Sequence, residues 1–164
     1  MFIFEKFMLQ RVQTIHLLLM FIICILSTTI NVPFYEIEKN EFSEKVMVYL
    51  NSSEMTSSQQ TTFQSNNYLI SVLAGIAFFS LISIISYKNR KLQLLLTSLN
   101  YLLIVLTILL MYGYSIQMHY FDTPSSTNFH LGIFVPLMLI IFNFLAFRGI
   151  KKDEMLIRSM DRHR

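Results

Sequence analysis

The sequence predicts an all-α membrane protein: a four-helix transmembrane bundle, N-in/C-in, with a cytoplasmic amphipathic C-terminal helix and a long outer loop with room for two short strands. Composition is the first observation behind this prediction. Of the 164 residues, 54% are hydrophobic and only 14% are charged, whereas ordinary soluble domains carry about 25% charged residues. The second observation is that the apolar residues form four long runs separated by polar segments. Because these spans and their connections fill residues 1–164, we expect a single integral membrane domain.

The middle two runs form a helical hairpin that the other spans flank. Spans at about 68–87 and 92–116 are joined by the basic turn 88–91. The first span covers about 12–30 and the fourth about 131–147. At a rise of 1.5 Å per residue, about 20 apolar residues cross a hydrocarbon core of about 30 Å. A cleaved signal peptide is the alternative for the first span, because a basic residue, an apolar run and small polar residues follow in that order.

Two outer loops connect the spans on the other side. In the longer loop, residues 31–67, apolar and polar residues alternate at 35–38 and 45–49, which predicts two short strands. Its second half, residues 51–67, is almost all Ser, Thr, Gln and Asn and cannot build a core. We therefore expect a mobile surface segment there. The shorter outer loop, residues 117–130, is expected to be a polar loop.

Lysine and arginine are distributed unequally between the two sides. The N-terminus, the 88–91 turn and the cytoplasmic tail at 148–164 carry two, three and six of them, whereas the outer loops carry two and none. Because cytoplasmic segments are enriched in basic residues, this asymmetry places both termini and the turn in the cytoplasm.

No Asp, Glu, Lys or Arg lies within the four proposed spans. Pumps and coupled transporters use such charges, so an active transporter is disfavoured. An enzyme is disfavoured as well, because Cys24 lies inside an apolar run and no serine stands in a nucleophile motif. We expect no catalytic residue and no cofactor. His119, Asp122 and His130 are potential metal ligands, but their spacing matches no strong motif and favours exposed polar residues.

Polar side chains recur near the cytoplasmic end of all four spans. Most lie about 3–12 Å inside the inner boundary of the bilayer. They form a candidate inner polar layer: Thr14, His16, Ser80, Ser83, Thr97, Asn100 and Asn143. Hydrogen bonds between helices, worth about 0.6 kcal/mol per contact, are the simpler interpretation. The alternative is a small polar cavity that opens inward and accepts a headgroup or a small solute.

The second span also contains a small-xxx-small spacing, from Ser71 to Gly75. Such spacing lets another helix approach closely. Packing within the bundle is favoured over dimerisation.

The charged tail is the strongest candidate for function. As a helix, it places Ile150, Ile157 and Met160 on one face. Such a helix could lie on anionic lipid, where each basic residue contributes about 1 kcal/mol, or it could dock on the 88–91 turn. A purely topological role explains the basic residues of the tail but not its interleaved acids.

We expect the tail helix to bend at Gly149 and lie along the membrane plane, with Asp153 or Glu154 close to Arg11 or to the 88–91 turn. The candidate cytoplasmic interaction surface comprises Gln10, Arg11, Lys88, Arg90, Lys91, Arg148, Lys151, Lys152, Asp153, Glu154, Arg158, Asp161 and Arg162. This surface suits anionic lipid headgroups of the bilayer or an unknown protein partner. Nucleic-acid binding is disfavoured, because three acids interleave with the six basic residues of the tail.

Three stretches of the sequence resemble one family of small bacterial inner-membrane proteins. They are residues 8–14 before the first span, 87–93 at the hairpin and 148–164 in the tail. The family is described as domain of unknown function forty-two ninety-three. The resemblance implies four spans with a retained first helix, and a multi-pass protein of the bacterial inner membrane. Its members begin at the position of Met8, which makes residues 1–7 either an extension or a misassigned start.

From these observations we expect a small integral membrane protein that acts as a structural or partner-binding component through its cytoplasmic face. A lipid- or small-solute-handling protein that uses the inner polar layer is the alternative. A membrane enzyme is the least favoured function.

Overall fold

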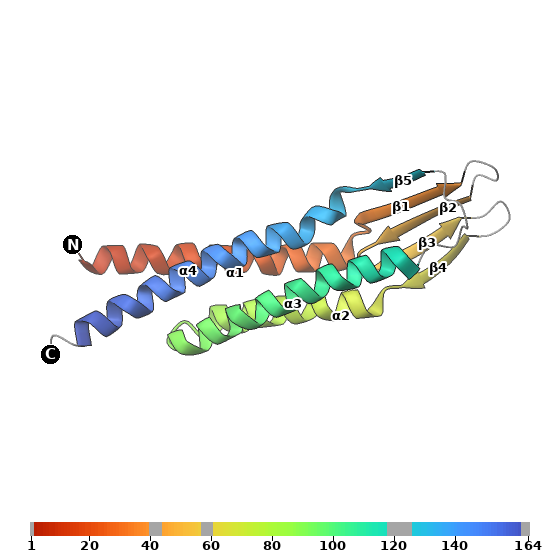
Figure 1. Cartoon of the computed structure of the whole chain (residues 1–164). Coiled ribbons are helices and arrows are strands. Elements are labelled where there is room, and N and C mark those ends of the chain that lie inside the picture. Colours follow the sequence, from red (N-terminus) through yellow and green to blue (C-terminus); the bar gives the residue numbers. More distant parts are fainter. Residues whose placement is uncertain (1, 40–43, 57–60, 118–125, 162–164) are drawn as a thin grey trace.

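The computed structural model describes residues 2–39, 44–56, 61–117 and 126–161, with the side chains of residues 12–38, 45–56, 61–116, 126–156 and 159. Its helices are α1 (Phe2–Thr29), α2 (Asn67–Ile85), α3 (Arg90–Gln117) and α4 (Val135–Asp161), and a short 3-10 turn, η1 (Leu131–Phe134), precedes α4. The four helices form a bundle, and a β-sheet extends that bundle at one end (Figure 1). Among the described residues the chain is therefore mostly helical, as the sequence predicts.

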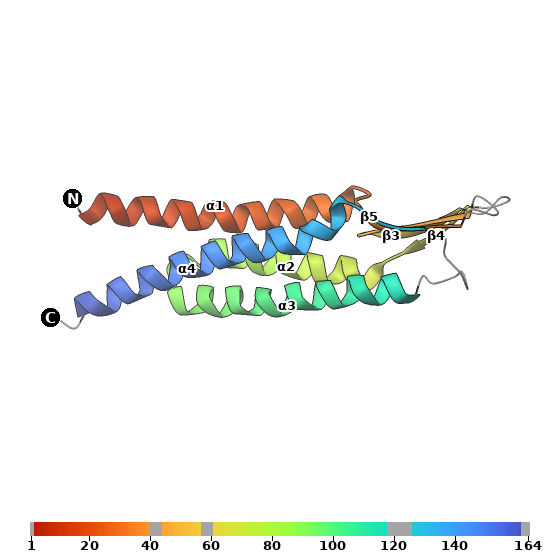
Figure 2. The ribbon, with the colours of Figure 1, turned by 45° about the horizontal axis from the view of Figure 1, so that its top comes forward.

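The two ends of the bundle carry different features. Both termini and the α2–α3 connection at 86–89 lie at one end, called here the turn end, and the sheet lies at the other, the sheet end (Figure 1). At the turn end, α1 and α4 extend past the α2–α3 connection in both views (Figure 2). Each helix packs on two others, since α1 and α3 both contact α2 and α4.

All four helices are long and apolar enough to cross a membrane, over Val12–Thr29, Asn67–Ile85, Arg90–Ile116 and Leu131–Leu156. Their outward faces are apolar: Leu102 and Leu109 of α3, for example, are 63% and 60% exposed. Their interior holds fully buried polar side chains such as Asn100 and Asn143. An apolar outer face, with some polar side chains buried among the apolar residues of the interior, differs from the polar outer face of a soluble bundle and suits a lipid environment.

The sheet has five antiparallel strands in the order β4-β3-β2-β1-β5. They are β1 (Pro33–Lys39), β2 (Glu44–Tyr49), β3 (Ser52–Thr56), β4 (Thr61–Ser65) and β5 (Ser126–Phe129). The two strands expected from alternation are confirmed as β1 and β2. β5 joins the sheet from the connection between α3 and α4, which is therefore more than the polar loop that the sequence predicts.

The segment at residues 51–67, predicted to be a mobile surface segment, is exposed along β4 but forms regular strands. β3 and β4 lie within it, and β3 pairs with both β2 and β4. Strand pairing uses backbone groups, so a segment rich in Ser and Thr can extend an existing sheet without large apolar side chains of its own.

Asn66 connects the sheet to α2. Its side chain is fully buried, with the amide nitrogen donating to the Tyr49 carbonyl at 2.7 Å and Oδ1 accepting from Ser53 Oγ at 2.9 Å. Its backbone N–H donates to the Asn51 carbonyl at 3.0 Å, and its own carbonyl accepts from the N–H of Ile70 in the first turn of α2. One residue thus bonds to β2, to β3, to the turn between them and to a helix.

One apolar core runs through the bundle and the sheet. Ile37, Val46 and Val48 on one face of the sheet are fully buried and belong to the same cluster as Leu69 and Leu73 of α2. The sheet therefore continues the packing of the bundle.

The expectation of a separate tail helix bent across the bundle at Gly149 is wrong, because α4 runs without a break through Gly149 to Asp161. The glycine serves helix contact instead of a bend. A Cβ at this position would lie 2.6 Å from Cγ of Gln13 on α1. The missing side chain therefore lets α1 and α4 approach closely.

Candidate functional site

An ion pair is buried at the turn end of the bundle. Arg90 Nη2 on α3 lies 3.4 Å from Asp153 Oδ2 on α4, and the two side chains are only 10% and 5% exposed. Arg90 is placed by the cap of its helix, since Asn89 Oδ1 accepts from the N–H of Leu92 at 3.2 Å. The expected approach of Asp153 to the 88–91 turn is confirmed at Arg90.

Two glutamines complete the hydrogen bonding of this pair. Gln13 on α1 donates from Nε2 to Asp153 Oδ2 at 3.1 Å, and its Oε1 accepts from Arg90 Nη1 at 3.4 Å. Gln93 accepts from Arg90 Nη1 at 3.0 Å and donates to the Ser83 carbonyl of α2 at 2.7 Å. We call Gln13, Arg90, Gln93 and Asp153 the turn-end cluster. It joins all four helices and gives both buried charges the partners that burial demands.

The remaining described basic side chains of the turn end are exposed. They are Lys88, Lys91, Arg148, Lys151 and Lys152. Glu154 is half-buried. The predicted interaction surface therefore divides into two parts, with Arg90 and Asp153 inside the bundle and the lysines and Arg148 outside. The side chains of Gln10, Arg11, Arg158, Asp161 and Arg162, which complete the predicted surface, lie outside the described residues.

The inner polar layer lies mostly inside the bundle. Asn100 Nδ2 on α3 donates to Ser80 Oγ on α2 at 3.2 Å. Asn143 Nδ2 on α4 donates to the Thr97 carbonyl on α3 at 2.9 Å. These side chains are fully buried, so hydrogen bonds between helices account for part of the layer. Thr14 is exposed and does not belong to the interior.

Four atoms of the layer lack a hydrogen-bond partner among the described residues. They are His16 Nδ1, Ser83 Oγ, Asn100 Oδ1 and Asn143 Oδ1. The His16 ring stacks on Phe142, with centroids 6.2 Å apart. An unpaired buried polar group costs about 1–3 kcal/mol. The layer therefore has hydrogen-bonding capacity left for water or a small polar solute.

A family model described as a domain of unknown function (DUF4293) matches residues 9–163. The chain belongs to this family. No curated protein matches its sequence. The three stretches that resemble DUF4293 contain all four residues of the turn-end cluster. Gln13 lies in the first stretch, Arg90 and Gln93 in the second, and Asp153 in the third. Segments far apart in the DUF4293 sequence thus meet in the turn-end cluster.

Sequence reasoning missed the two glutamines of this DUF4293 chain. Gln13 begins the first span, and Gln93 follows Arg90 by three residues, a spacing at which helical side chains meet. A glutamine side chain that is buried at the edge of an apolar run needs a hydrogen-bond partner. Glutamines in such positions are therefore the sequence feature from which this cluster could have been predicted.

The metal-ligand hypothesis gains no support from the described residues, among which no group of three His, Cys, Asp or Glu side chains could hold a metal ion. His119 and Asp122 lie outside the described residues. His130 Nε2 instead forms a short hydrogen bond with Glu36 Oε2, and Lys45 Nζ lies 2.5 Å from Glu36 Oε1. The hydrogen bond from Lys45 holds the pKa of Glu36 below its usual range, against the opposing effect of burial.

Gly75, the second small residue of the small-xxx-small spacing of α2, faces a neighbouring helix, whereas Ser71 is exposed. A Cβ at Gly75 would lie 3.4 Å from Leu103 Cδ1 of α3. This contact supports packing within the bundle as the role of the spacing.

Proposed function

We propose that this DUF4293 chain is a structural, partner-binding component of the bacterial inner membrane, with its turn end in the cytoplasm and without enzymatic activity. The partner is an acidic protein surface that contacts the basic turn end. Four helices of sufficient length and hydropathy support the membrane placement. The excess of lysine and arginine at the turn end supports the orientation.

The division of charge at the turn end carries the proposal. Asp153 bonds inward to Arg90 and Gln13, and so it fixes α4 against α1 and α3. Its negative charge is therefore neutralised inside the bundle, while five of the described basic side chains stay exposed. A fixed helix holds these basic groups in one arrangement, which suits a partner of complementary charge.

α4 also offers apolar surface next to these basic groups. Met155 and Leu156 are 57% and 48% exposed and follow closely after Lys151 and Lys152. The C-terminal end of α4 extends beyond the α2–α3 connection (Figure 1). Protein interfaces combine such apolar contacts with a charged rim, which favours a protein partner over anionic headgroups alone.

Charge reversal tests the proposal. The double variant Lys151→Glu and Lys152→Glu is produced at native level. The amount of partner protein that copurifies with it should be about tenfold lower than with the wild type. The control, Lys151→Arg and Lys152→Arg, keeps the charge and should recover the partner fully. Proteins and lipids that copurify in mild detergent are measured by mass spectrometry. Equal recovery by the reversed variant contradicts the proposal, and selective loss of anionic lipid assigns the surface to the membrane.

A reporter that works only in the cytoplasm tests the orientation. It should be active at Asn89 and after Arg164, whereas a reporter active only outside should work near Ser57. An outside-active signal after Arg164 would contradict the orientation, because an even number of spans leaves both termini on one side.

The four unpartnered atoms of the inner polar layer favour a second function, the handling of a lipid or small solute. If the layer serves only helix contact, Asn143→Leu costs about 1 kcal/mol or less. If the layer holds a solute, this variant loses a copurifying small molecule while its unfolding temperature stays near that of the wild type.

A further inference from the structure

A groove of about 750 Å³ opens where the sheet meets the helices. Three elements form it: the edge strand β4, the beginning of α2 and the last turns of α3. Its volume falls within the range of about 300–1,000 Å³ that is typical of small-molecule sites. It lies at the opposite end of the bundle from the turn-end cluster and is independent of the function proposed above.

The lining of the groove changes from polar to apolar along the bundle. Gln64 and Ser65 of β4 and Asn67 of α2 line it beside the sheet, and Leu109 and Leu110 of α3 line it deeper in the bundle. Leu110 precedes the end of α3 by seven residues, or about 10 Å at 1.5 Å per residue. The groove therefore extends from the sheet into the part of α3 that is apolar enough to cross a membrane.

Two tyrosines line the groove between these regions. Tyr68 is 73% exposed in the first turn of α2, and Tyr114 lies near the end of α3. Tyrosine rings favour the boundary between hydrocarbon and water. This boundary therefore crosses the groove, with amides and a hydroxyl on its aqueous side and leucines on its lipid side.

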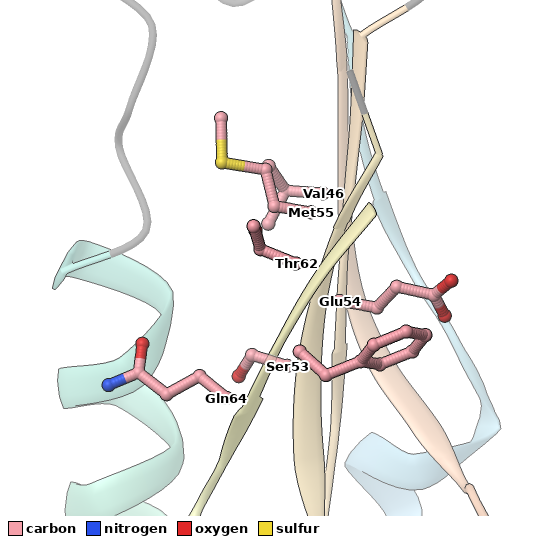
Figure 3. A pocket seen from close by; sticks show the side chains of 7 residues that line it. Val46, Ser53, Glu54, Met55, Thr62 and Gln64 are labelled. Carbon is pink, nitrogen blue, oxygen red and sulfur yellow. The ribbon is translucent and has the colours of Figure 1, made fainter. Parts of the chain in front are cut away.

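None of the described residues that line the groove is charged. Its aqueous side offers amide and hydroxyl groups, which both donate and accept hydrogen bonds. Gln64 points toward the end of α3 (Figure 3) and also lines a smaller pocket of about 300 Å³ on the same face of the sheet, with Ser53 and Thr62. Hydrogen-bonding groups thus continue from the groove onto the sheet.

We propose that this groove binds one phospholipid of the leaflet at the sheet end. An acyl chain lies against Leu109, Leu110 and Gly113, and a zwitterionic, hydrogen-bonding headgroup contacts Gln64 and Asn67. A lipid fits better than a peptide, because the deeper half of the groove needs an occupant without backbone polar groups. The uncharged lining among the described residues favours a zwitterionic headgroup over an anionic one, since an anionic site carries basic side chains.

Gly113 allows a direct test of this site. A Cβ at Gly113 would meet no atom within 4 Å, so the side chain of Gly113→Leu starts from open space and is expected to fill the groove. The matched control is Ala74→Leu, an exposed small residue of α2 that does not line the groove. The full chain is released from nanodiscs of dioleoyl-phosphatidylethanolamine and dioleoyl-phosphatidylglycerol, and native mass spectrometry counts the lipids that it retains.

The wild type and Ala74→Leu should each retain one phosphatidylethanolamine, and Gly113→Leu should retain about tenfold less. The site is overturned if Gly113→Leu retains as much phosphatidylethanolamine as the wild type. It is also overturned if the wild type retains phosphatidylglycerol in preference to phosphatidylethanolamine, or a peptide in place of lipid. A second variant, Gln64→Ala with Asn67→Ala, changes only exposed side chains. It should retain about fivefold less phosphatidylethanolamine than the wild type. Unchanged retention by this variant overturns the proposal even if Gly113→Leu fails to fold.

Discussion

The two ends of the molecule hold their charges in different surroundings. At the turn end, Arg90 and Asp153 meet from two helices, and neither side chain is more than 10% exposed. At the sheet end, Glu36 meets Lys45 from the neighbouring strand, and the Lys45 side chain is 40% exposed. The first pair joins segments far apart in the sequence inside the bundle. The second joins adjacent strands with one partner in solvent.

This comparison shows that burial decides what an ionic contact does for the fold. Loss of one partner of a buried pair leaves an uncompensated charge and costs about 3–5 kcal/mol, whereas an exposed pair contributes about 0.2–1 kcal/mol. We therefore expect the turn end to control the integrity of the bundle and the sheet end to respond weakly to pH.

Removal of Asp153 should have the largest effect. Asp153→Ala leaves Arg90 buried without a counter-charge, and we expect a loss of about 3–5 kcal/mol in the free energy of unfolding. Helical circular dichroism during denaturation in detergent micelles measures it. The control Lys152→Ala alters an exposed neighbour and should stay within about 0.5 kcal/mol of the wild type. If the two variants unfold alike, the buried pair does not stabilise the turn end.

Two glycines provide the next comparison. Gly149→Ala places a methyl group 2.6 Å from Cγ of Gln13, whose amide is held by Asp153 and Arg90. We expect a cost of about 1–3 kcal/mol from overpacking. Gly113→Ala meets open space and should gain up to about 1 kcal/mol from helix propensity. The same denaturation assay compares them, and equal values would show that α1 and α4 can separate at Gly149 at little cost.

The smallest effect concerns pH at the sheet end. The pKa of Glu36 is lowered in the folded protein, chiefly by the hydrogen bond from Lys45. Between the folded and unfolded pKa values the unfolded chain binds more protons, so this stabilisation is present at neutral pH and is lost as pH falls through the folded pKa. Because Lys45 is partly exposed, we expect less than about 1 kcal/mol.

Hydrogen exchange of β1 and β2 should therefore accelerate on acidification, after correction for the intrinsic pH dependence of exchange. Glu36→Gln should remove this acceleration while α2 and α3 keep their protection. An equal change in the helices would show that acid acts on the whole bundle and that the sheet end has no separate response.

The helices could be predicted because each depends on a local property, a long apolar run. The short basic turn also predicts that Arg90 projects at the end of a helical hairpin, and the acids of the tail predict its partner. This reasoning placed Asp153 or Glu154 close to Arg11 or to the 88–91 turn, and in the structure the contact lies between Asp153 and Arg90. It failed at Gly149, because a glycine in a helix can permit either a bend or a close approach, and only the position of Gln13 on another helix decides between them.

The sheet could be predicted only in part. β1 and β2 show alternation, since one of their faces is buried against the core. β4 shows none, because every one of its described side chains is exposed and its strand conformation comes from pairing with β3. Likewise, Gln13 and Gln93 acquire their role from partners on other helices. Long-range pairing of this kind leaves little trace in the local sequence.

The bonds of Asn66 give the molecule a mechanical property. Asn66 bonds to β2, to β3 and to the turn between them, and its carbonyl accepts the first backbone hydrogen bond of α2. A lateral force on the sheet is therefore passed directly to the N-terminal end of this helix. Tilting of the sheet is then transmitted along α2 toward the connection at 86–89. Without the Asn66 side chain the bonds to Tyr49 and Ser53 would be lost, and the backbone bonds of Asn66 and the shared apolar core would hold the sheet against α2 alone.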